Sequence, residues 1–306
     1  MVVRLTTEAE LRAAVSMPTA IAAVRQALLD LADGQFDLPP RIHHADGAYL
    51  VMTAYSSRAE STVVKSLSLD SQRTPSIVGT TTWTSTSTPQ VVVADAGPVT
   101  SMRTGAIVGV ATDALAAADA SRLVLYGAGC QAADQVRAVH AVRPLTELAI
   151  VARTADRGWR LAGALEAELP GVTVTVHRPG DEDLSRADVV CCATPATEPL
   201  FRAAGLPGDV HVNAIGSYRP SMRELPDELV DAATVLAVDD VAACLAEAGE
   251  LIRARARGML PERLTPLHTL LAGCERPAGR TVFKSVGLAV QDWALMELLA
   301  RATTGP

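Results

Sequence analysis

The sequence predicts an α/β fold with a Rossmann-type, doubly wound parallel sheet and a second, smaller α+β region. A short apolar strand, Leu123–Tyr126, runs directly into a Gly-x-Gly turn and then into a helical pattern rich in Ala and Val. Strand and helix signals alternate after this turn, as in a parallel sheet with crossover helices. Before it, short strand signals separated by Ser, Thr, Gly and Pro indicate a small antiparallel sheet.

The N-terminal region predicts two helices followed by this antiparallel sheet. Thr7 and Glu10 have capping-box spacing, which predicts a helix that extends to Val15. A second helix is expected over residues 18–32, ending at Gly34. The strand candidates are Tyr49–Met52, Ser61–Val64, Ile77–Val78 and Gln90–Val93. The Thr- and Ser-rich run 80–88 fits either a linker or an exposed strand or hairpin, and a helix over residues 100–118 leads to the glycine turn.

The region after the glycine turn predicts the parallel sheet. Its strand candidates are Leu148–Val151, Val172–Val176, Asp188–Cys192, Val210–Ala214 and Val235–Val238. Residues 205–208 and 261–266 are expected to be loops. A strand-like segment over residues 281–287 and a helix over residues 288–300 end the chain.

The glycine turn has the order that a Rossmann phosphate site needs. Gly127 allows the tight turn, Gly129 lets backbone approach a pyrophosphate, and the small Ala132 lies where helix packs on strand. The pyrophosphate would lie on the helix N-terminus, where free N–H groups favour an anion. The alternative is a plain strand-to-helix turn that binds nothing. The strand–turn–helix context favours a dinucleotide.

The second half of this motif favours NADP(H), with NAD(H) also possible. An NAD site usually places an acid about 20 residues past the glycines to bond the ribose hydroxyls. No Asp or Glu lies between Leu148 and Ala155, where Arg153 and Thr154 occur instead, with Arg157 close behind. An Arg can bind a 2′-phosphate bidentately, whereas a carboxylate would repel it. The alternative is that these arginines are solvated residues at a helix start.

Composition indicates an enzyme of the cytoplasm and excludes several other classes. The 306 residues allow about two domains, and the net charge of −7 argues against nucleic-acid binding. The five cysteines form no Cys-x-x-Cys pair, which suits a reducing compartment. We expect no membrane association, since neither a signal pattern nor a spanning apolar run is present. The scattered histidines predict no metal site.

These motifs together resemble the ornithine cyclodeaminase/μ-crystallin family, and the resemblance runs almost end to end. The segments that carry it are Gly34…Pro40-Arg41, Val64-Lys65, Thr100–Ala106, Gly127–Ala132, Ala187–Val190, Ala193-Thr194, His211–Gly216, Arg223–Leu225, Gly249–Leu251 and Thr281–Asp292. The Arg-Thr-Gly-Ala and Thr-Val-Phe-Lys-Ser-Val-Gly segments are the most specific.

The resemblance implies a two-domain subunit and a homodimer. Residues 1–118 would form a substrate-binding and dimerisation portion, residues 119–279 the inserted Rossmann domain, and residues 280–306 a return to the first domain. Family members are cyclodeaminases, amino-acid dehydrogenases, ketimine reductases and synthases that join amino acids through an imine. Their substrates are small 2-amino or 2-imino acids, and they share hydride transfer at Cα.

The resemblance also assigns site residues. Arg41, Lys65 and Arg103 match the positions that hold the substrate carboxylate, and Lys65 is expected to be the general acid/base. Each alone would more simply be a surface cation; His43 and His44 are expected to be structural or solvated. The expected cofactor-binding residues are Thr104, Gly127, Gly129, Cys130, Gln131, Arg153, Thr154, Arg157, Thr194, Ser217, Lys284, Val286 and Gly287.

Two departures from the cyclodeaminase pattern bear on the substrate. Tyr218 and Leu50 stand where that branch carries acids, one for ring closure and ammonia release and one for the distal amine of ornithine. A diamino acid needs a carboxylate near its far ammonium, so both changes favour an apolar, aromatic or cyclic side chain. We therefore expect an NADPH-dependent reductase of a carboxylated imine, or an amino-acid dehydrogenase. The alternatives are an ornithine cyclodeaminase-like enzyme with recycled NAD and a non-catalytic NADPH or small-ligand binding protein of μ-crystallin type.

Overall fold

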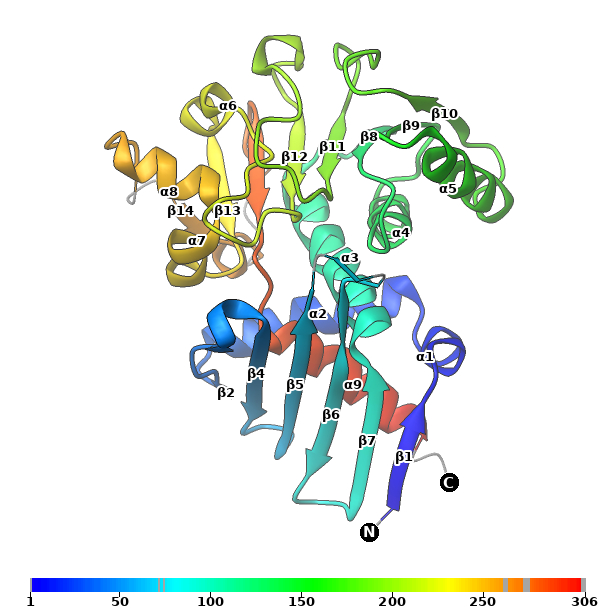
Figure 1. Ribbon diagram of the computed structural model, residues 1–306, viewed down its shortest axis with the longest axis vertical. Coiled ribbons are helices and arrows are strands. Elements are labelled where there is room, and N and C mark those ends of the chain that lie inside the picture. Colours follow the sequence, from blue (N-terminus) through cyan, green and yellow to red (C-terminus); the bar gives the residue numbers. More distant parts are fainter. Residues whose placement is uncertain (1, 71, 74, 261–263, 272–275, 304–306) are drawn as a thin grey trace. The chain divides into compact units, whose positions relative to one another are not determined.

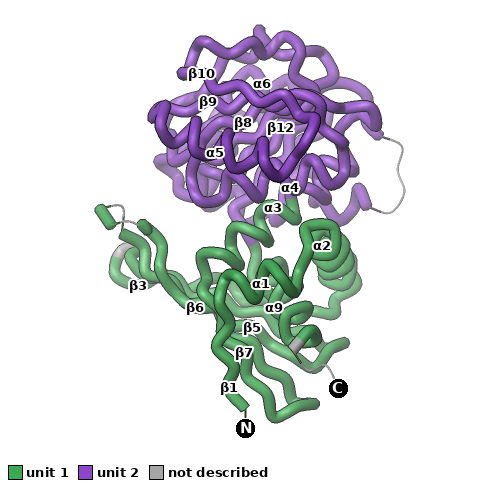
Figure 2. Tube along the Cα trace, turned by 90° about the vertical axis from the view of Figure 1, so that its right-hand side faces the viewer, with its two compact units in different colours: residues 1–107, 288–306 green, residues 108–287 purple. Residues whose placement is uncertain are grey.

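The chain divides into two compact units, each with its own sheet (Figure 2). The computed structural model describes residues 2–70, 72–73, 75–260, 264–271 and 276–303. Unit 1 comprises residues 1–107 and 288–306, and unit 2 comprises residues 108–287. The chain therefore leaves unit 1 for unit 2 and then returns, the order of segments that the resemblance implies.

Unit 1 contains a seven-stranded, mainly antiparallel sheet. Its strands are β1 (Val2–Thr6), β2 (Phe36–Asp37), β3 (Ile42–His44), β4 (Tyr49–Ser56), β5 (Ser61–Leu69), β6 (Ile77–Ser85) and β7 (Gln90–Asp95). The order is β1-β7-β6-β5-β4-β2, with β3 also paired to β4 and with β1 parallel to β7. Most of the threonine-rich run lies in β6, so it is a strand and not a linker. The pairing of β1 was not expected from the sequence.

Helices cover one face of this sheet. They are α1 (Glu8–Ala14), α2 (Met17–Ala32), α9 (Ala289–Thr303) and the first part of α3 (Ala96–Leu115), and a short 3₁₀ turn, η1 (Ala45–Gly47), precedes β4. The predicted capping box is present, since Thr7 accepts from the Glu10 N–H and Glu10 accepts from the Thr7 N–H. Helix α9 packs on β4, β5 and β6 and lies behind them in Figure 1. Side chains that alternate along β5 therefore point either toward α9 or toward the uncovered face.

Unit 2 is a doubly wound parallel sheet of eight strands. They are β8 (Arg122–Tyr126), β9 (Glu147–Val151), β10 (Thr173–His177), β11 (Val189–Cys192), β12 (His211–Ala214), β13 (Val235–Val238), β14 (Leu264–Pro266) and β15 (Thr281–Lys284). The order β10-β9-β8-β11-β12-β15-β13-β14 reverses direction between β8 and β11. In such sheets ligands bind outside the carboxyl ends of the strands at this reversal. The sheet confirms the predicted fold class.

The connections of unit 2 are mostly helical. They are the remainder of α3, α4 (Ala132–Val142), α5 (Ala155–Glu168), α6 (Asp227–Ala232), α7 (Val241–Glu247), α8 (Gly249–Ala256) and the 3₁₀ turns η2 (Ala203–Gly205) and η3 (Leu267–Leu270). Every residue of β11, β12 and β15 is buried, as expected of central strands covered on both faces.

Three expected boundaries differ from the structure. Strand β15 pairs with β12 and β13, so the return to unit 1 begins at residue 288 and not at residue 280. Helix α3 crosses the other boundary, which lies after residue 107 and not after residue 118. Residues 264–266 form β14 where a loop was expected, because the apolar Leu264 pairs with Leu236 of β13; residues 261–263 of that expected loop lie outside the described residues.

Candidate active site

Only two of the 27 Lys and Arg residues are lysines, Lys65 and Lys284, and both side chains are buried. Burying an ammonium is costly unless it is paired and hydrogen-bonded. A chain that uses arginine elsewhere and lysine at two buried positions places there a cation whose proton is easier to remove. Each lysine lies in a polar cluster of its own unit.

Lys65 lies on the covered face of the unit 1 sheet. Burial alternates along β5, so Val63, Lys65 and Leu67 point inward. Met52 of β4 and Thr81 of β6 lie directly opposite Lys65 in the two neighbouring strands. The ammonium therefore reaches the layer in which α3 and α9 cover the sheet.

The Lys65 ammonium contacts both helices. Nζ donates to Thr100 Oγ1 of α3 at 2.5 Å and to Asp292 Oδ1 of α9 at 2.8 Å. Arg103 Nε lies 3.5 Å from the same carboxylate oxygen, and Arg103 Nη1 donates to Gln291 Oε1 at 2.6 Å. One buried carboxylate thus faces two cations, which leaves the cluster with excess positive charge.

Burial lowers the pKa of Lys65 from 10.5 to about 8. The Asp292 carboxylate opposes this effect because it favours the charged ammonium, whereas the positive charges of Arg103 and Arg41 lower the pKa further. A lysine with a pKa of about 8 can give or take a proton near neutral pH, as a general acid/base must.

Several buried polar atoms around this cluster have no hydrogen-bond partner among the described residues. They are Thr81 Oγ1, Thr104 Oγ1, Gln291 Nε2 and Asp292 Oδ2. Buried polar groups are normally satisfied, and leaving one unsatisfied costs about 1–3 kcal/mol. Both donors and acceptors are represented here, so the cluster suits a small polar ligand that carries an anionic and a nitrogenous group.

Four further residues considered from the sequence lie in this part of unit 1. Arg41 is half-buried immediately before β3, and its charge reaches Lys65. Leu50 is buried on the same face of β4 as Met52, so it supplies an apolar neighbour and no countercharge. His43 and His44 are exposed on β3. The structure does not bring the two histidines into the cluster.

Unit 2 contains a pocket of about 240 Å³ at the end of β8 and β9. It is lined by Tyr126, Gly127, Ala128, Gly129, Val151, Ala152, Arg153, Thr154, Arg157, Pro179, Ala193, Thr194, Pro195, Ala196 and Leu200. The glycine turn and the segment after β9, which the sequence assigned to one dinucleotide, therefore border one cavity.

The two glycines of the turn differ in what they permit. Gly127 has φ +107°, and a Cβ there would lie 2.6 Å from the Ala193 carbonyl oxygen, so only glycine fits. At Gly129 a Cβ would meet nothing within 4 Å. Gly127 therefore shapes the turn, whereas Gly129 leaves its backbone open to a ligand at the N-terminus of α4, where the Gln131 side chain makes no capping hydrogen bond.

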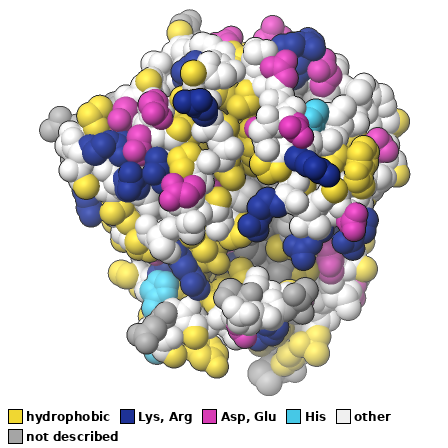
Figure 3. Space-filling model, turned by 45° about the horizontal axis from the view of Figure 1, so that its top comes forward, with side chains coloured by type: hydrophobic (Ala, Val, Ile, Leu, Met, Phe, Trp, Pro, Cys, Tyr) yellow, Lys and Arg dark blue, Asp and Glu magenta, His cyan; other side chains and the backbone are white. Residues whose placement is uncertain are grey.

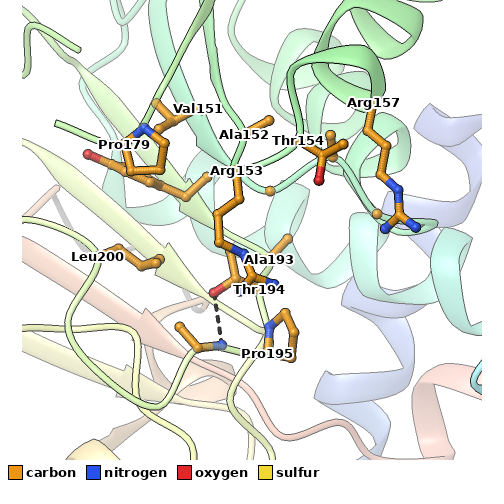
Figure 4. A pocket seen from close by; sticks show the side chains of 15 residues that line it. Val151, Ala152, Arg153, Thr154, Arg157, Pro179, Ala193, Thr194, Pro195 and Leu200 are labelled. Atoms are coloured by element: carbon orange, nitrogen blue, oxygen red, sulfur yellow. Dashed lines mark hydrogen bonds between the residues drawn. The ribbon is translucent and has the colours of Figure 1, made fainter. Parts of the chain in front are cut away.

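The pocket is lined by basic residues and by no acidic residue among those that the structure describes. Figure 4 shows Arg153 and Arg157 extending to two sides of Thr154, whose side chain makes no cap to α5. The nearby Glu182 is engaged by the Tyr126 hydroxyl at 2.7 Å and by the Gly180 N–H at 2.7 Å. The pocket therefore offers a positive rim to an anionic ligand.

A buried carboxylate, Glu224, supports the wall of this pocket. It accepts from the N–H and the hydroxyl of Thr194 at 2.7 and 2.9 Å, and from the N–H groups of Gly216 and Ser217 at 2.8 and 3.2 Å. Burial raises the pKa of Glu224, and the positive charge of Lys284 opposes that effect. Glu224 ties the loops after β11 and β12 together.

Ser217 also joins the second lysine cluster. Lys284 Nζ donates to the Ser217 carbonyl and hydroxyl, both at 2.6 Å, and lies 3.6 Å from Glu250 Oε1. After β15, the Asp239 carboxylate accepts from the Gly287 N–H at 2.8 Å and from the Val286 N–H at 3.4 Å.

The predicted cofactor residues thus fall into groups. Those that line the pocket are Gly127, Gly129, Arg153, Thr154, Arg157 and Thr194. Cys130 and Gln131 follow in the same turn, and Ser217, Lys284, Val286 and Gly287 lie in the supporting clusters. Thr104 belongs to the unit 1 cluster. Tyr218 follows Ser217, and the Arg219 guanidinium lies 5.7 Å from the centre of its ring.

Sequence reasoning gave no role to three residues that organise these sites: Thr100, Asp292 and Glu224. Each lies in a segment that carried the family resemblance. A signal existed for Asp292, because it lies in the first turn of the mainly apolar helix α9, where a buried acid must find a partner. Thr100 gave no such signal, since a threonine can satisfy its hydroxyl on its own helix.

Basic and acidic side chains are interspersed over the face shown in Figure 3. The described residues hold no group of three or more His, Cys, Asp or Glu that could bind a metal ion. None of the helices in the described ranges is both long enough and apolar enough to cross a membrane.

Comparison with known proteins decides the family. Residues 1–303 match the model of the ornithine cyclodeaminase/mu-crystallin family. The chain belongs to this family.

Relatives and solved structures agree with this assignment. A Delta(1)-pyrroline-2-carboxylate reductase of Bacillus thuringiensis is 36% identical over 202 residues, which cover 63% of this chain and 61% of the reductase. A Delta(1)-pyrroline-2-carboxylate/Delta(1)-piperideine-2-carboxylate reductase of Azospirillum brasilense is 30% identical over 94% of this chain and 91% of its own. The structure of Thermococcus litoralis Delta(1)-pyrroline-2-carboxylate reductase with NADH and L-proline has TM-score 0.90 and 28% identity, covering 98% of this chain and 97% of that one.

Proposed function

We propose that the protein is an NADPH-dependent reductase of carboxylated imines, which it converts to the corresponding amino acids. The observation that carries the proposal is the buried Lys65, with a pKa lowered to about 8, between one carboxylate and two arginines. The activities for which its relatives are named, reduction of Delta(1)-pyrroline-2-carboxylate and Delta(1)-piperideine-2-carboxylate, support the same substrate class.

In this proposal the unit 1 cluster binds the substrate. Arg41 and Arg103 hold the carboxylate, since guanidinium groups bind carboxylates through paired hydrogen bonds. Lys65 then protonates the imine nitrogen, which makes the neighbouring carbon a better hydride acceptor. Leu50 and Met52 provide apolar surface beside the reacting group and no partner for a second ammonium.

The unit 2 pocket fits a nicotinamide dinucleotide. The open Gly129 backbone and the uncapped start of α4 suit a pyrophosphate, and Arg153, Thr154 and Arg157 suit a ribose 2′-phosphate. When bound, the reduced cofactor supplies the hydride; the protein supplies orientation and charge. The similar structure from Thermococcus litoralis contains NADH. The proposed preference of this protein for NADPH over NADH therefore rests on its own Arg153 and Arg157.

Arg153→Asp should reverse the cofactor preference. The wild-type protein is expected to bind NADPH more tightly than NADH, because a charge-assisted phosphate contact contributes roughly 1.5–3 kcal/mol, about one to two decades in affinity. Titration calorimetry with both cofactors measures this. Arg160→Asp, which adds the same charge to an exposed position of α5 outside the pocket lining, should keep the wild-type preference. Equal affinities in the wild-type protein would contradict the assignment.

The rate of imine reduction should depend on the protonation of Lys65. The ammonium is the active form, so kcat/KM should be highest below the Lys65 pKa of about 8 and fall as pH rises through it. Amino-acid oxidation needs the neutral amine and should rise over the same range. Lys65→Met should bind NADPH yet lose about 10²–10⁴-fold in turnover. A variant that reduces imines at the wild-type rate would show that Lys65 is not the acid.

The substrate should have an uncharged side chain. An unpaired buried ammonium costs several kcal/mol, so we expect no proline from ornithine with NAD. NADPH oxidation is expected with cyclic ketimine carboxylates or with 2-oxo acids mixed with amines, followed by nicotinamide absorbance. Ornithine turnover with ammonia release and no net redox change would instead establish the cyclodeaminase reaction. If the panel and ornithine both gave no reaction while NADPH bound, a binding protein would be the better description.

The uncovered face of the unit 1 sheet supports a homodimer. Exposed side chains on its strands include Tyr49, Tyr55, Val64 and Val78, and the alternate positions of β5 and β6 beside them carry Thr, Ser and Val rather than charges. A sheet face with few charges and with exposed Tyr and Val side chains is typical of an interface that a second copy covers.

Val64→Glu should therefore produce a monomer in light scattering after size exclusion, because it would bury a carboxylate without a partner in the interface. Trp159→Glu, at a 61% exposed position of α5 in unit 2, is the matched control and should leave the dimer intact. A monomeric wild-type protein would contradict the dimer.

A further inference from the structure

The hydrogen bonds of the Lys65 amino group go to helices α3 and α9. An ammonium has three N–H donors. Two of them go to Thr100 Oγ1 at 2.5 Å and to Asp292 Oδ1 at 2.8 Å. These acceptors come from different helices, so Nζ is fixed from two sides, and only the third tetrahedral position remains.

Thr100 accepts from Lys65 and cannot donate to it. The Thr100 hydroxyl donates its own proton to the Ala96 carbonyl oxygen one helical turn earlier, at 2.5 Å. A carbonyl oxygen is an acceptor only, so that proton is committed. Lys65 must therefore always present an N–H to the Thr100 hydroxyl oxygen.

The same two bonds survive when Lys65 loses a proton. A neutral amine has two N–H groups and one lone pair, and the two N–H groups are what Thr100 and Asp292 require. The third position then carries the lone pair in place of an N–H. The ammonium and the neutral amine of Lys65 therefore differ only at this third position, which carries an N–H in one and a lone pair in the other.

We propose, on the basis of the reductase function proposed above, that Thr100 and Asp292 are positioning residues which hold Lys65 so that this third position faces the nitrogen of the imino or amino acid. In reduction an N–H bond of the Lys65 ammonium breaks and an N–H bond forms on the substrate nitrogen. The hydride and its two electrons come from NADPH, and Lys65 is left as the neutral amine until solvent returns a proton. Oxidation runs the same transfers in reverse.

The two positioning residues contribute differently. Asp292 supplies both geometry and charge. Burial and the positive charges of Arg103, in α3, and Arg41, just before β3, lower the pKa of Lys65, and the Asp292 carboxylate opposes this lowering. Thr100 is neutral and supplies geometry. Loss of Asp292 should therefore move the titration of Lys65, whereas loss of the Thr100 hydroxyl should mainly slow the transfer.

Nuclear magnetic resonance of the full-length protein tests the Asp292 role without any substrate. Lysine labelled at the ε-carbon gives only two side-chain signals, Lys65 and Lys284, because the chain has no other lysine. In Asp292→Asn the Lys65 signal should titrate at lower pH than in the wild-type protein. Glu297→Gln is the matched control: it makes the same change in a buried carboxylate of the same helix, which bonds Ser61 and Trp83 and does not contact Lys65. An unchanged Lys65 titration in folded Asp292→Asn overturns the proposal.

Kinetics test the Thr100 role. Thr100→Val keeps the shape and removes the acceptor, and it should lower kcat for reduction by about 10- to 100-fold with a much smaller change in KM, because misplacing a reacting group by about 1 Å costs that much. Thr100→Ser keeps the acceptor and should recover most of the rate. Thr100→Val turning over at the wild-type kcat overturns the proposal.

The outcomes separate this inference from the reductase function. If the wild-type protein reduces imines but Asp292→Asn leaves the Lys65 titration and the pH profile unchanged, the positioning role is wrong and the reductase function stands. If Lys65 shifts in Asp292→Asn while the wild-type protein reduces no imine, the arrangement around Lys65 is right and the proposed reaction is wrong.

Discussion

The buried ion pair between Lys65 and Asp292 is the constraint on which unit 1 depends. Both side chains are excluded from water, and their contact at 2.8 Å joins residues 227 positions apart in the chain. A buried charge without its partner is strongly destabilising, by about 3–5 kcal/mol when one member is removed. The pair therefore ties the returning helix α9 to β5, and the same contact opposes the lowering of the Lys65 pKa by burial.

Unit 2 exposes the backbone of its glycine turn to an anion, and hydrogen bonds hold the neighbouring loops in place. Gly127 must be glycine because its Cβ would collide with the Ala193 carbonyl, whereas the open side of Gly129 is left for a ligand. Glu224 compensates for the loss of regular structure by accepting four hydrogen bonds from the loops behind the pocket. A rigid wall then lies beside two arginines that no lining acid neutralises.

Much of this architecture could be predicted, because the patterns involved are local. A few consecutive residues are enough to identify the Gly-x-Gly turn, each apolar strand of the parallel sheet and the missing acid after β9. The pairings of β1 with β7 and of β15 with β12 and β13 were not predictable in this way, since they join distant segments. The same limit applies to the site: Lys65 was identified from its sequence context, but its partners Thr100 and Asp292 follow only from the packing of two helices on one sheet.

We propose that Lys65 exchanges its proton with the substrate nitrogen, and a crystal structure of the protein with oxidised cofactor and a cyclic amino acid would show whether the two nitrogens meet. We predict that the amino nitrogen lies within about 2.6–3.2 Å of Lys65 Nζ, in the direction not occupied by Thr100 or Asp292, with the carboxylate on Arg41 and Arg103. A complex in which Lys65 instead binds only the carboxylate, with the nitrogen beyond hydrogen-bonding distance, would show that Lys65 is not the acid.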